Sequence, residues 1–210
     1  MPIRPRCPMS MAMDPLPVLM FGLATACTPG PNNAMIAASG ANYGYRRTLP
    51  LMLGIILGAT VLFAAVAIGL GTVITRIPEL QAALKALGTA FLFYLAYKIA
   101  TAPPPGSPQD NRRGTAQIGF TEGFLFQAIN PKAWTVGVSV VALFTQPGAS
   151  YAASATQLVA ILFLCGIISA NVWAGFGLIL GQLLTTPRRH RIFSLVMGAL
   201  TAASALLIVI

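Results

Sequence analysis

Six apolar stretches, each long enough to cross a lipid bilayer as a helix, account for most of this chain of 210 residues. An α-helix rises about 1.5 Å per residue, so about 20 residues cross the ~30 Å hydrocarbon core. Charged residues make up only 8% of the chain, whereas a soluble domain typically has about 25%. We therefore predict an all-α polytopic membrane helix bundle and exclude soluble enzymes and secreted, disulfide-stapled domains. The six predicted spans are residues 16–42, 49–74, 80–100, 118–144, 155–184 and 192–210.

Basic residues are concentrated in alternate gaps between these stretches, which predicts the orientation of the chain in the bilayer. Cytoplasmic loops of membrane proteins carry an excess of Lys and Arg, so these gaps are expected in the cytoplasm and both termini outside. The net charge of +9 is explained in this way, and no binding of nucleic acid is expected. His190 lies within the last basic cluster and is expected to be solvated. The basic residues in these gaps are Arg46, Arg47, Lys98, Arg112, Arg113, Arg188, Arg189 and Arg191.

The chain is predicted to form a single transmembrane domain, residues 1–210, built from two halves. The longest gap, residues 101–117, contains P-P-P-G-S-P and is typical of a flexible linker. It separates a first half, residues 16–100, from a second half, residues 118–210. Cys7, Cys27 and Cys165 stand apart without a C-x-x-C pair, so neither a metal site nor a cofactor is expected.

Two predicted spans are interrupted by proline at corresponding positions, and this pair of breaks indicates a binding site. T-P-G-P-N-N lies at residues 28–33 and I-N-P-K-A-W at residues 129–134, with Pro31 and Pro131 100 residues apart. Three spans separate the two breaks, so the halves have opposite orientation. Such paired interruptions in inverted halves are the best sequence indication of a transporter's binding site. The alternative is a pair of proline kinks that only shape helix packing. The candidate binding residues are Thr28, Pro29, Gly30, Pro31, Asn32, Asn33, Asn130, Pro131, Lys132 and Asn171.

Lys132 is the basic residue near the middle of a predicted span, where a charge costs at least ~2.5–3.5 kcal/mol. Three explanations stay open: its ammonium reaches the membrane surface, it is neutral, or its partner is the substrate or a backbone carbonyl. Glu122, near the cytoplasmic end of the same span, is either a solvated carboxylate or part of a proton relay. Asn171 either lines the cavity or makes a hydrogen bond between helices. Glu122 and Lys132 are the candidates for proton coupling.

The two proline motifs, with several flanking matches, resemble the LysE/RhtB family of bacterial amino-acid exporters over residues 16–210. The matches include G-I-I-L-G at residues 54–58, K-A-L-G-T-A-F-L-F-Y-L-A-Y-K at residues 85–98, G-F-T-E-G-F-L-F-Q-A-I-N-P-K at residues 119–132 and N-V-W-A at residues 171–174. The glycines at 54 and 58 are expected to form a helix-packing face.

The resemblance implies a secondary transporter in the bacterial inner membrane that exports amino acids or their derivatives, driven by the proton gradient. It also implies that the central site consists of Pro29, Gly30, Pro31, Asn32, Asn130, Pro131 and Lys132. No acidic residue lies near the middle of a predicted span, so a small neutral amino acid is expected rather than a cationic one. Its partners would be protons and the lipid bilayer, and a homodimer is an open option.

Two other functions are compatible with broken spanning helices. A passive channel for small solutes would use the same midplane elements but could not accumulate its solute. A membrane redox protein would need a cysteine on each broken helix. Cys27 precedes the first break, but its counterpart 100 residues later is Gln127, which argues against that function and against an enzyme.

Overall fold

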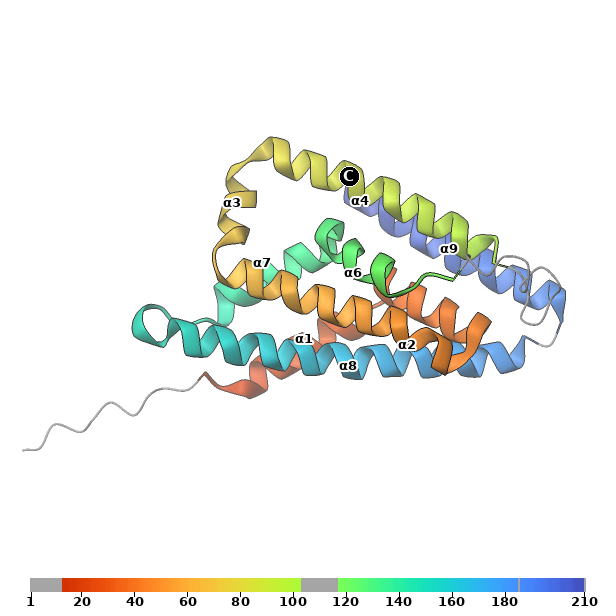
Figure 1. The fold of residues 1–210 in the computed structure, drawn as a ribbon, viewed down its shortest axis with the longest axis horizontal. Coiled ribbons are helices and arrows are strands. Elements are labelled where there is room, and N and C mark those ends of the chain that lie inside the picture. Colours follow the sequence, from red (N-terminus) through yellow and green to blue (C-terminus); the bar gives the residue numbers. More distant parts are fainter. Residues whose placement is uncertain (1–12, 103–116, 185, 210) are drawn as a thin grey trace, which may run out of the picture.

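The computed structural model describes residues 13–102, 117–184 and 186–209, and their regular structure is entirely helical (Figure 1). This confirms the predicted all-helical class. The N-terminal tail and most of the predicted linker lie outside the described residues. The helices are α1 (Pro15–Cys27), α2 (Pro31–Ala67), α3 (Leu70–Arg76), α4 (Pro78–Ala100), α6 (Phe120–Ile129), α7 (Pro131–Phe144), the 3₁₀ turn η1 (Gly148–Ser150), α8 (Tyr151–Leu183) and α9 (Pro187–Val209).

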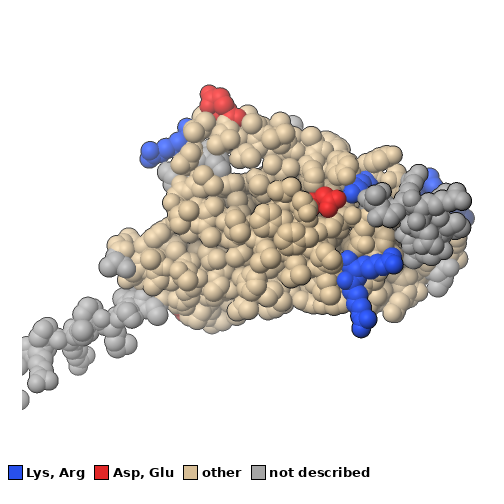
Figure 2. Space-filling view, in the orientation of Figure 1, with Lys and Arg blue, Asp and Glu red and all other residues tan. Residues whose placement is uncertain are grey.

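The surface of the described helices suits a lipid environment. Three of them, α2, α4 and α8, are long and apolar enough to cross a membrane, and α1 and α7 are shorter apolar helices. Large apolar side chains are exposed along the molecule, for example Met20, Leu125 and Ile179. Charged side chains gather toward the two ends of the long axis and leave the middle of the visible face uncharged (Figure 2). A water-soluble protein would need charge in that middle region.

Both predicted interruptions are present as gaps between helices. α1 ends at Cys27 and α2 begins at Pro31, while α6 ends at Ile129 and α7 begins at Pro131. Each second helix has proline in its first turn, where the missing N–H removes no intrahelical hydrogen bond. Proline therefore begins a new helix at each break instead of bending a continuous one.

The connections around the second predicted span differ from expectation. The residues between the first two spans, expected to be a loop, belong to α2, which is kinked at Gly44 with φ 77° and ψ 171°. The predicted span at residues 49–74 is divided, because α2 ends at Ala67 and Gly69 has φ 107° before α3 begins. Positive φ is accessible to glycine at little cost, and single glycines gave no sequence signal strong enough to place these bends.

Close glycine contacts show which helices run side by side. A Cβ on Gly177 of α8 would lie 2.1 Å from the carbonyl oxygen of Ala37 in α2. A Cβ on Gly54, beyond the kink of α2, would lie 2.2 Å from the carbonyl oxygen of Phe120 in α6. The two parts of α2 therefore pack against different partners, α8 and α6. The expectation that Gly54 and Gly58 form a helix-packing face is confirmed, and α4 packs mainly against α9.

Candidate functional site

A cavity of about 110 Å³ lies where the two breaks meet, between α1, α2, α6, α7 and α8. One water molecule needs roughly 10–15 Å³ of such space, so the cavity suits a small solute or several waters. One side is apolar, with Phe63, Val136 and Phe163 among its residues. Six of the ten predicted binding residues line the cavity: Gly30, Pro31, Asn32, Asn33, Asn130 and Lys132.

Three side-chain amides join the two breaks across this cavity. Asn32 Nδ2 donates to Gln127 Oε1, and Gln127 Nε2 donates back to Asn32 Oδ1, both at 3.0 Å. Asn130 Nδ2 lies 3.2 Å from Gln127 Oε1 and 3.4 Å from Asn32 Oδ1. Gln127 and Asn130 are almost fully buried. Because a buried amide without partners costs about 1–3 kcal/mol, this cluster ties α2 to the end of α6.

The carbonyl groups freed at the first break accept hydrogen bonds from side chains of other helices. Asn33 Nδ2 donates to Ala26 O at 2.8 Å and to Thr28 O at 2.9 Å. Ser169 Oγ, from α8, also donates to Ala26 O at 2.7 Å. A helix end in an apolar environment must have its carbonyl groups satisfied, and at this break most of the donors come from outside α1.

Lys132 reaches from the second break to the first. Its Nζ donates to Thr28 O at 3.0 Å, and it lies 3.2 Å from the position that a Cβ on Gly30 would take. Of the three explanations for this lysine, the structure agrees with a backbone-carbonyl partner. Among the described residues the one ion pair joins Lys98 and Glu122, so the ammonium faces the cavity without a carboxylate.

The second break is closed by its own residues. Asn130 ends α6, and its Oδ1 accepts a hydrogen bond from Lys132 N at 3.2 Å, which caps α7. Trp134 Nε1 donates to Ala128 O at 2.8 Å. Asparagine is among the best N-cap residues, so local chemistry explains why α7 begins here. Gly30, at the corresponding position before α2, provides no side-chain cap.

Four predicted binding residues do not line the cavity: Thr28, Pro29, Pro131 and Asn171. Thr28 takes part through its carbonyl oxygen, and the two prolines shape the breaks. Asn171 lies elsewhere, with its Oδ1 accepting a hydrogen bond from Tyr45 of α2 at 2.5 Å. Of the two alternatives for Asn171, the structure therefore agrees with the interhelical hydrogen bond.

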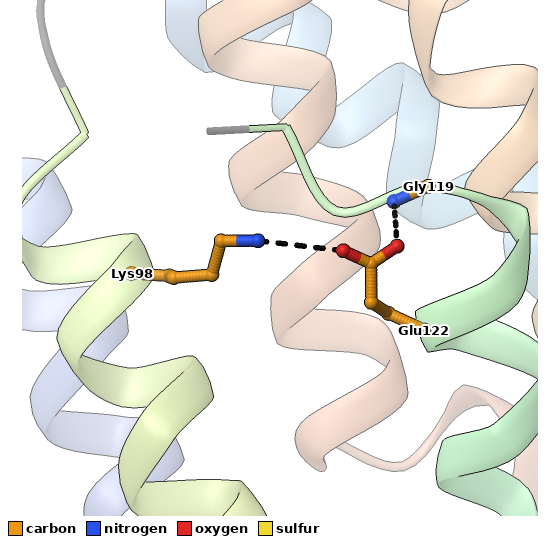
Figure 3. A network of polar contacts seen from close by, with 3 residues as sticks. All are labelled: Lys98, Gly119 and Glu122. Carbon is orange, nitrogen blue, oxygen red and sulfur yellow. Dashed lines mark hydrogen bonds and ion pairs between the residues drawn. The ribbon is translucent and has the colours of Figure 1, made fainter. Parts of the chain in front are cut away.

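Glu122 also lies away from the cavity, in the first turn of α6. Its carboxylate accepts from Gly119 N at 2.9 Å and pairs with Lys98 of α4 at 3.4 Å (Figure 3). The side chain is 35% exposed. An acidic group near a helix N-terminus is favourable, so these contacts explain its presence by helix capping and by the link to α4.

The expectation that His190 is solvated is wrong. The side chain is 2% exposed, because it points from α9 into the bundle and contacts Asn42 of α2. The neighbouring arginines are exposed and follow the predicted pattern. The charged residues around it indicated a solvent-exposed segment. They did not indicate that His190 lies on the face of the helix that packs into the bundle.

Gln127 and Ser169 were not among the predicted binding residues, yet both line the cavity and bond to its breaks. Gln127 lies three residues before Asn130, and residues at that spacing share one face of a helix. This spacing could have identified Gln127. Ser169 comes from α8, and its position depends on the packing of that helix, for which the sequence gave no signal.

Comparisons with known proteins identify the family that this chain resembles in sequence. Residues 23–210 match a protein family described as LysE type translocator. The cysteine/O-acetylserine efflux protein of Salmonella typhimurium is 30% identical over 173 residues, covering 81% of this chain and 83% of the relative. The protein of the same name from Escherichia coli is 28% identical over 157 residues, covering 73% and 77%. No solved structure gives a significant match.

Proposed function

Because this chain belongs to the family of LysE type translocators, we propose that it is a secondary transporter that exports small neutral amino acids or their derivatives. Protons moving inward drive the export, and the protein resides in the bacterial inner membrane. Its relatives are efflux proteins for cysteine and O-acetylserine by name, and neither compound has a cationic side chain. This membership supports a transporter rather than an enzyme.

The observation that carries the proposal is the charge pattern of the cavity between the two breaks. Lys132 Nζ and the N-terminus of α2, which has no side-chain cap at Gly30, form a positive side. Amide oxygens of Asn32 and Gln127 form an uncharged, electron-rich side. A zwitterion fits both. Helix N-termini and ammonium groups attract a carboxylate, and a substrate ammonium can replace Asn130 Nδ2 as a donor to these amide oxygens.

The absence of acids from the cavity lining selects against a cationic substrate. Asp14, Glu79 and Glu122, the described carboxylates, are not among the residues that line it. A lysine or arginine side chain would bring a second positive charge beside Lys132 with no described carboxylate to balance it. Burial of an unpaired charge costs several kcal/mol, so the substrate side chain is neutral and faces Phe63, Val136 and Phe163.

We propose an architecture of six spans in two inverted halves, residues 16–100 and 118–210, joined by the linker at 101–117. The packing supports this arrangement, because the first broken pair, α1 and the start of α2, runs beside α8. The second broken pair, α6 and α7, runs beside the later part of α2. Each broken pair thus packs on the second span of the opposite half, and this symmetry supports two inverted halves.

The proposed orientation places the basic end of the bundle in the cytoplasm and both termini outside. Arg46 and Arg47 follow the kink of α2, and Arg188 to Arg191 begin α9. This distribution follows the positive-inside rule. The broken helices meet away from both ends, at a depth where a substrate could be reached alternately from either side.

Purified protein in liposomes tests the proposed function. Internal pH is followed while neutral, acidic and basic amino acids are offered, in wild-type protein, Lys132→Ala and the control Lys85→Ala, an exposed lysine outside the cavity. We expect proton flux with neutral amino acids that is lost in Lys132→Ala and kept in Lys85→Ala. Solute movement without proton movement would instead indicate a channel. Full flux in Lys132→Ala would exclude this lysine from the binding site.

A further inference from the structure

The histidine at position 190 is buried at the basic end of the bundle, outside the central cavity, and has no role in the site described above. It is the single histidine of the chain. Its Nε2 lies 2.5 Å from Asn42 Oδ1, and because an amide oxygen only accepts, Nε2 carries the proton in this pair. His190 and Asn42 are 2% and 5% exposed.

The other ring nitrogen of His190 is free to accept a proton. Nδ1 is one of three buried polar side-chain atoms that lack a hydrogen-bond partner within the described part of the chain, and Ser194 Oγ, one turn later on α9, is another. Neutral His190 has a lone pair at Nδ1, and protonation there makes an imidazolium whose new N–H can donate to Ser194 Oγ. A bond between these two atoms would satisfy both, with Ser194 donating to the neutral ring or accepting from the imidazolium.

The charged groups on the neighbouring elements oppose a permanent positive charge at His190. On α9, Arg188, Arg189 and Arg191 are exposed on either side of it. On α4, Tyr94 and Tyr97 are exposed, and Lys98, whose charge is balanced by Glu122 of α6, lines a second cavity with Asn42 and Tyr43 of α2. Arg46 and Arg47 are exposed beyond Gly44. The balance around the histidine is positive, and burial lowers the pKa of its imidazole, so both factors favour the neutral ring and ready release of a bound proton.

Asn42 connects this histidine to the wall of the central cavity. It lies two residues before the kink at Gly44, where Ser39 and Thr48 hydrogen-bond across the bend at 2.9 Å. The part of α2 before the kink carries Asn32 and Asn33 to the cavity, and the part after it carries Phe63. Asn42 also lines the second cavity, about 20 Å³, which is large enough for one water molecule, since a water needs roughly 10–15 Å³.

We infer that His190 is the proton-binding residue of this transporter, acting through Asn42 on the bend of α2. This inference rests on the proposed proton-coupled export. In each cycle Nδ1 takes up one proton that enters from the outer side, and the imidazolium keeps its Nε2–H bond to Asn42 and strengthens it by its charge. The pull of α9 on α2 increases, and the two parts of α2 that line the cavity shift relative to each other. Release of the proton to the cytoplasmic side returns the neutral ring seen in the structure.

A direct test uses the fact that the chain contains one histidine. Protein with ¹⁵N-labelled histidine and no histidine tag is placed in lipid nanodiscs, and its imidazole signals are followed from about pH 5 to about pH 9. We expect titration in wild-type protein and a midpoint raised by about one unit or more in Asn42→Asp, which supplies a carboxylate. Asn171→Asp, an equivalent change at an asparagine bonded to Tyr45, is the control. A signal that does not titrate, or an unchanged midpoint in Asn42→Asp, would overturn the inference.

A transport assay separates this inference from the proposed function. His190→Gln keeps a side-chain N–H that can donate to Asn42 but cannot bind a proton near neutral pH. In liposomes we expect it to exchange internal for external L-cysteine while its amino-acid-dependent proton flux falls to the level of protein-free liposomes. Proton flux that survives in His190→Gln would refute the inference and leave the exporter intact. Wild-type protein without proton flux would refute the proposed coupling, and the inference with it.

Discussion

The two helix breaks face the same cavity but are closed in opposite ways. At the second break one residue, Asn130, ends α6 and caps α7 with its own side chain. At the first break three residues, 28–30, are non-helical, and Gly30 offers no cap. The carbonyl groups there are satisfied by Asn33, Ser169 and Lys132, which come from α2, α8 and α7.

This difference indicates that the two breaks have different roles, one in stability and the other in binding. A break that is closed locally is a fixed structural element, since its hydrogen bonds form whenever the helices form. A break that is closed by distant side chains can exchange those donors for a ligand, because the lysine ammonium can turn from a backbone carbonyl to a substrate carboxylate. We therefore expect the second break to contribute mainly to stability and the first mainly to binding.

The largest loss of stability and transport is expected where the amide cluster joins the two breaks. Gln127→Leu removes both hydrogen bonds to Asn32 and one from Asn130. It leaves Asn32 Nδ2 unpaired at about 1–3 kcal/mol, while Asn130 Nδ2 keeps its bond to Asn32 Oδ1. We expect a clearly lower unfolding temperature in detergent and loss of transport. Thermal unfolding and liposome transport measure the two effects. If stability and transport both stay at the wild-type level, the amide cluster does not hold the breaks together.

A smaller loss of stability is expected at the second break, which its own residues close. Asn130→Ala removes the bonds of Asn130 Nδ2 to Gln127 and Asn32. It also removes the side-chain cap of α7, which typically costs about 1 kcal/mol. Asn130→Ser should restore most of that loss, since serine caps helices about as well as asparagine. Thermal unfolding of the two variants gives the comparison. Equal unfolding temperatures for the alanine and serine variants would show that capping is not the role of this residue.

The smallest effect on stability is expected at the open break. Gly30 has an extended backbone with φ −179°, which alanine also adopts, so Gly30→Ala should leave the unfolding temperature unchanged. The added Cβ would lie 3.2 Å from Lys132 Nζ and displace the ammonium. We expect a several-fold higher KM for transport, consistent with about 1 kcal/mol of lost binding. An unchanged KM, or a large loss of stability, would contradict a binding role for this break.

The sequence located the breaks but not the partners that satisfy them. Proline lacks an N–H and disfavours a helical residue before it, so the two motifs specify interruption wherever the helices pack. Asn171 and His190 show the limit of this reasoning. Asn171 was placed on a helix whose faces the sequence did not orient, and His190 was placed in a solvated gap although it belongs to α9. Both side chains bond to α2, and those contacts exist only in the assembled bundle.

By itself, the sequence determined an all-helical chain for a lipid environment, two proline breaks 100 residues apart and a lysine beside the second one. These features depend on hydropathy, on the missing proline N–H and on spacing along the chain, which are local properties. The tertiary structure decided that Lys132 crosses to the first break, that Gln127 and Ser169 join the cavity and that His190 is buried. These depend on the rotation and depth of each helix, which are set by close glycine contacts between helices distant in sequence.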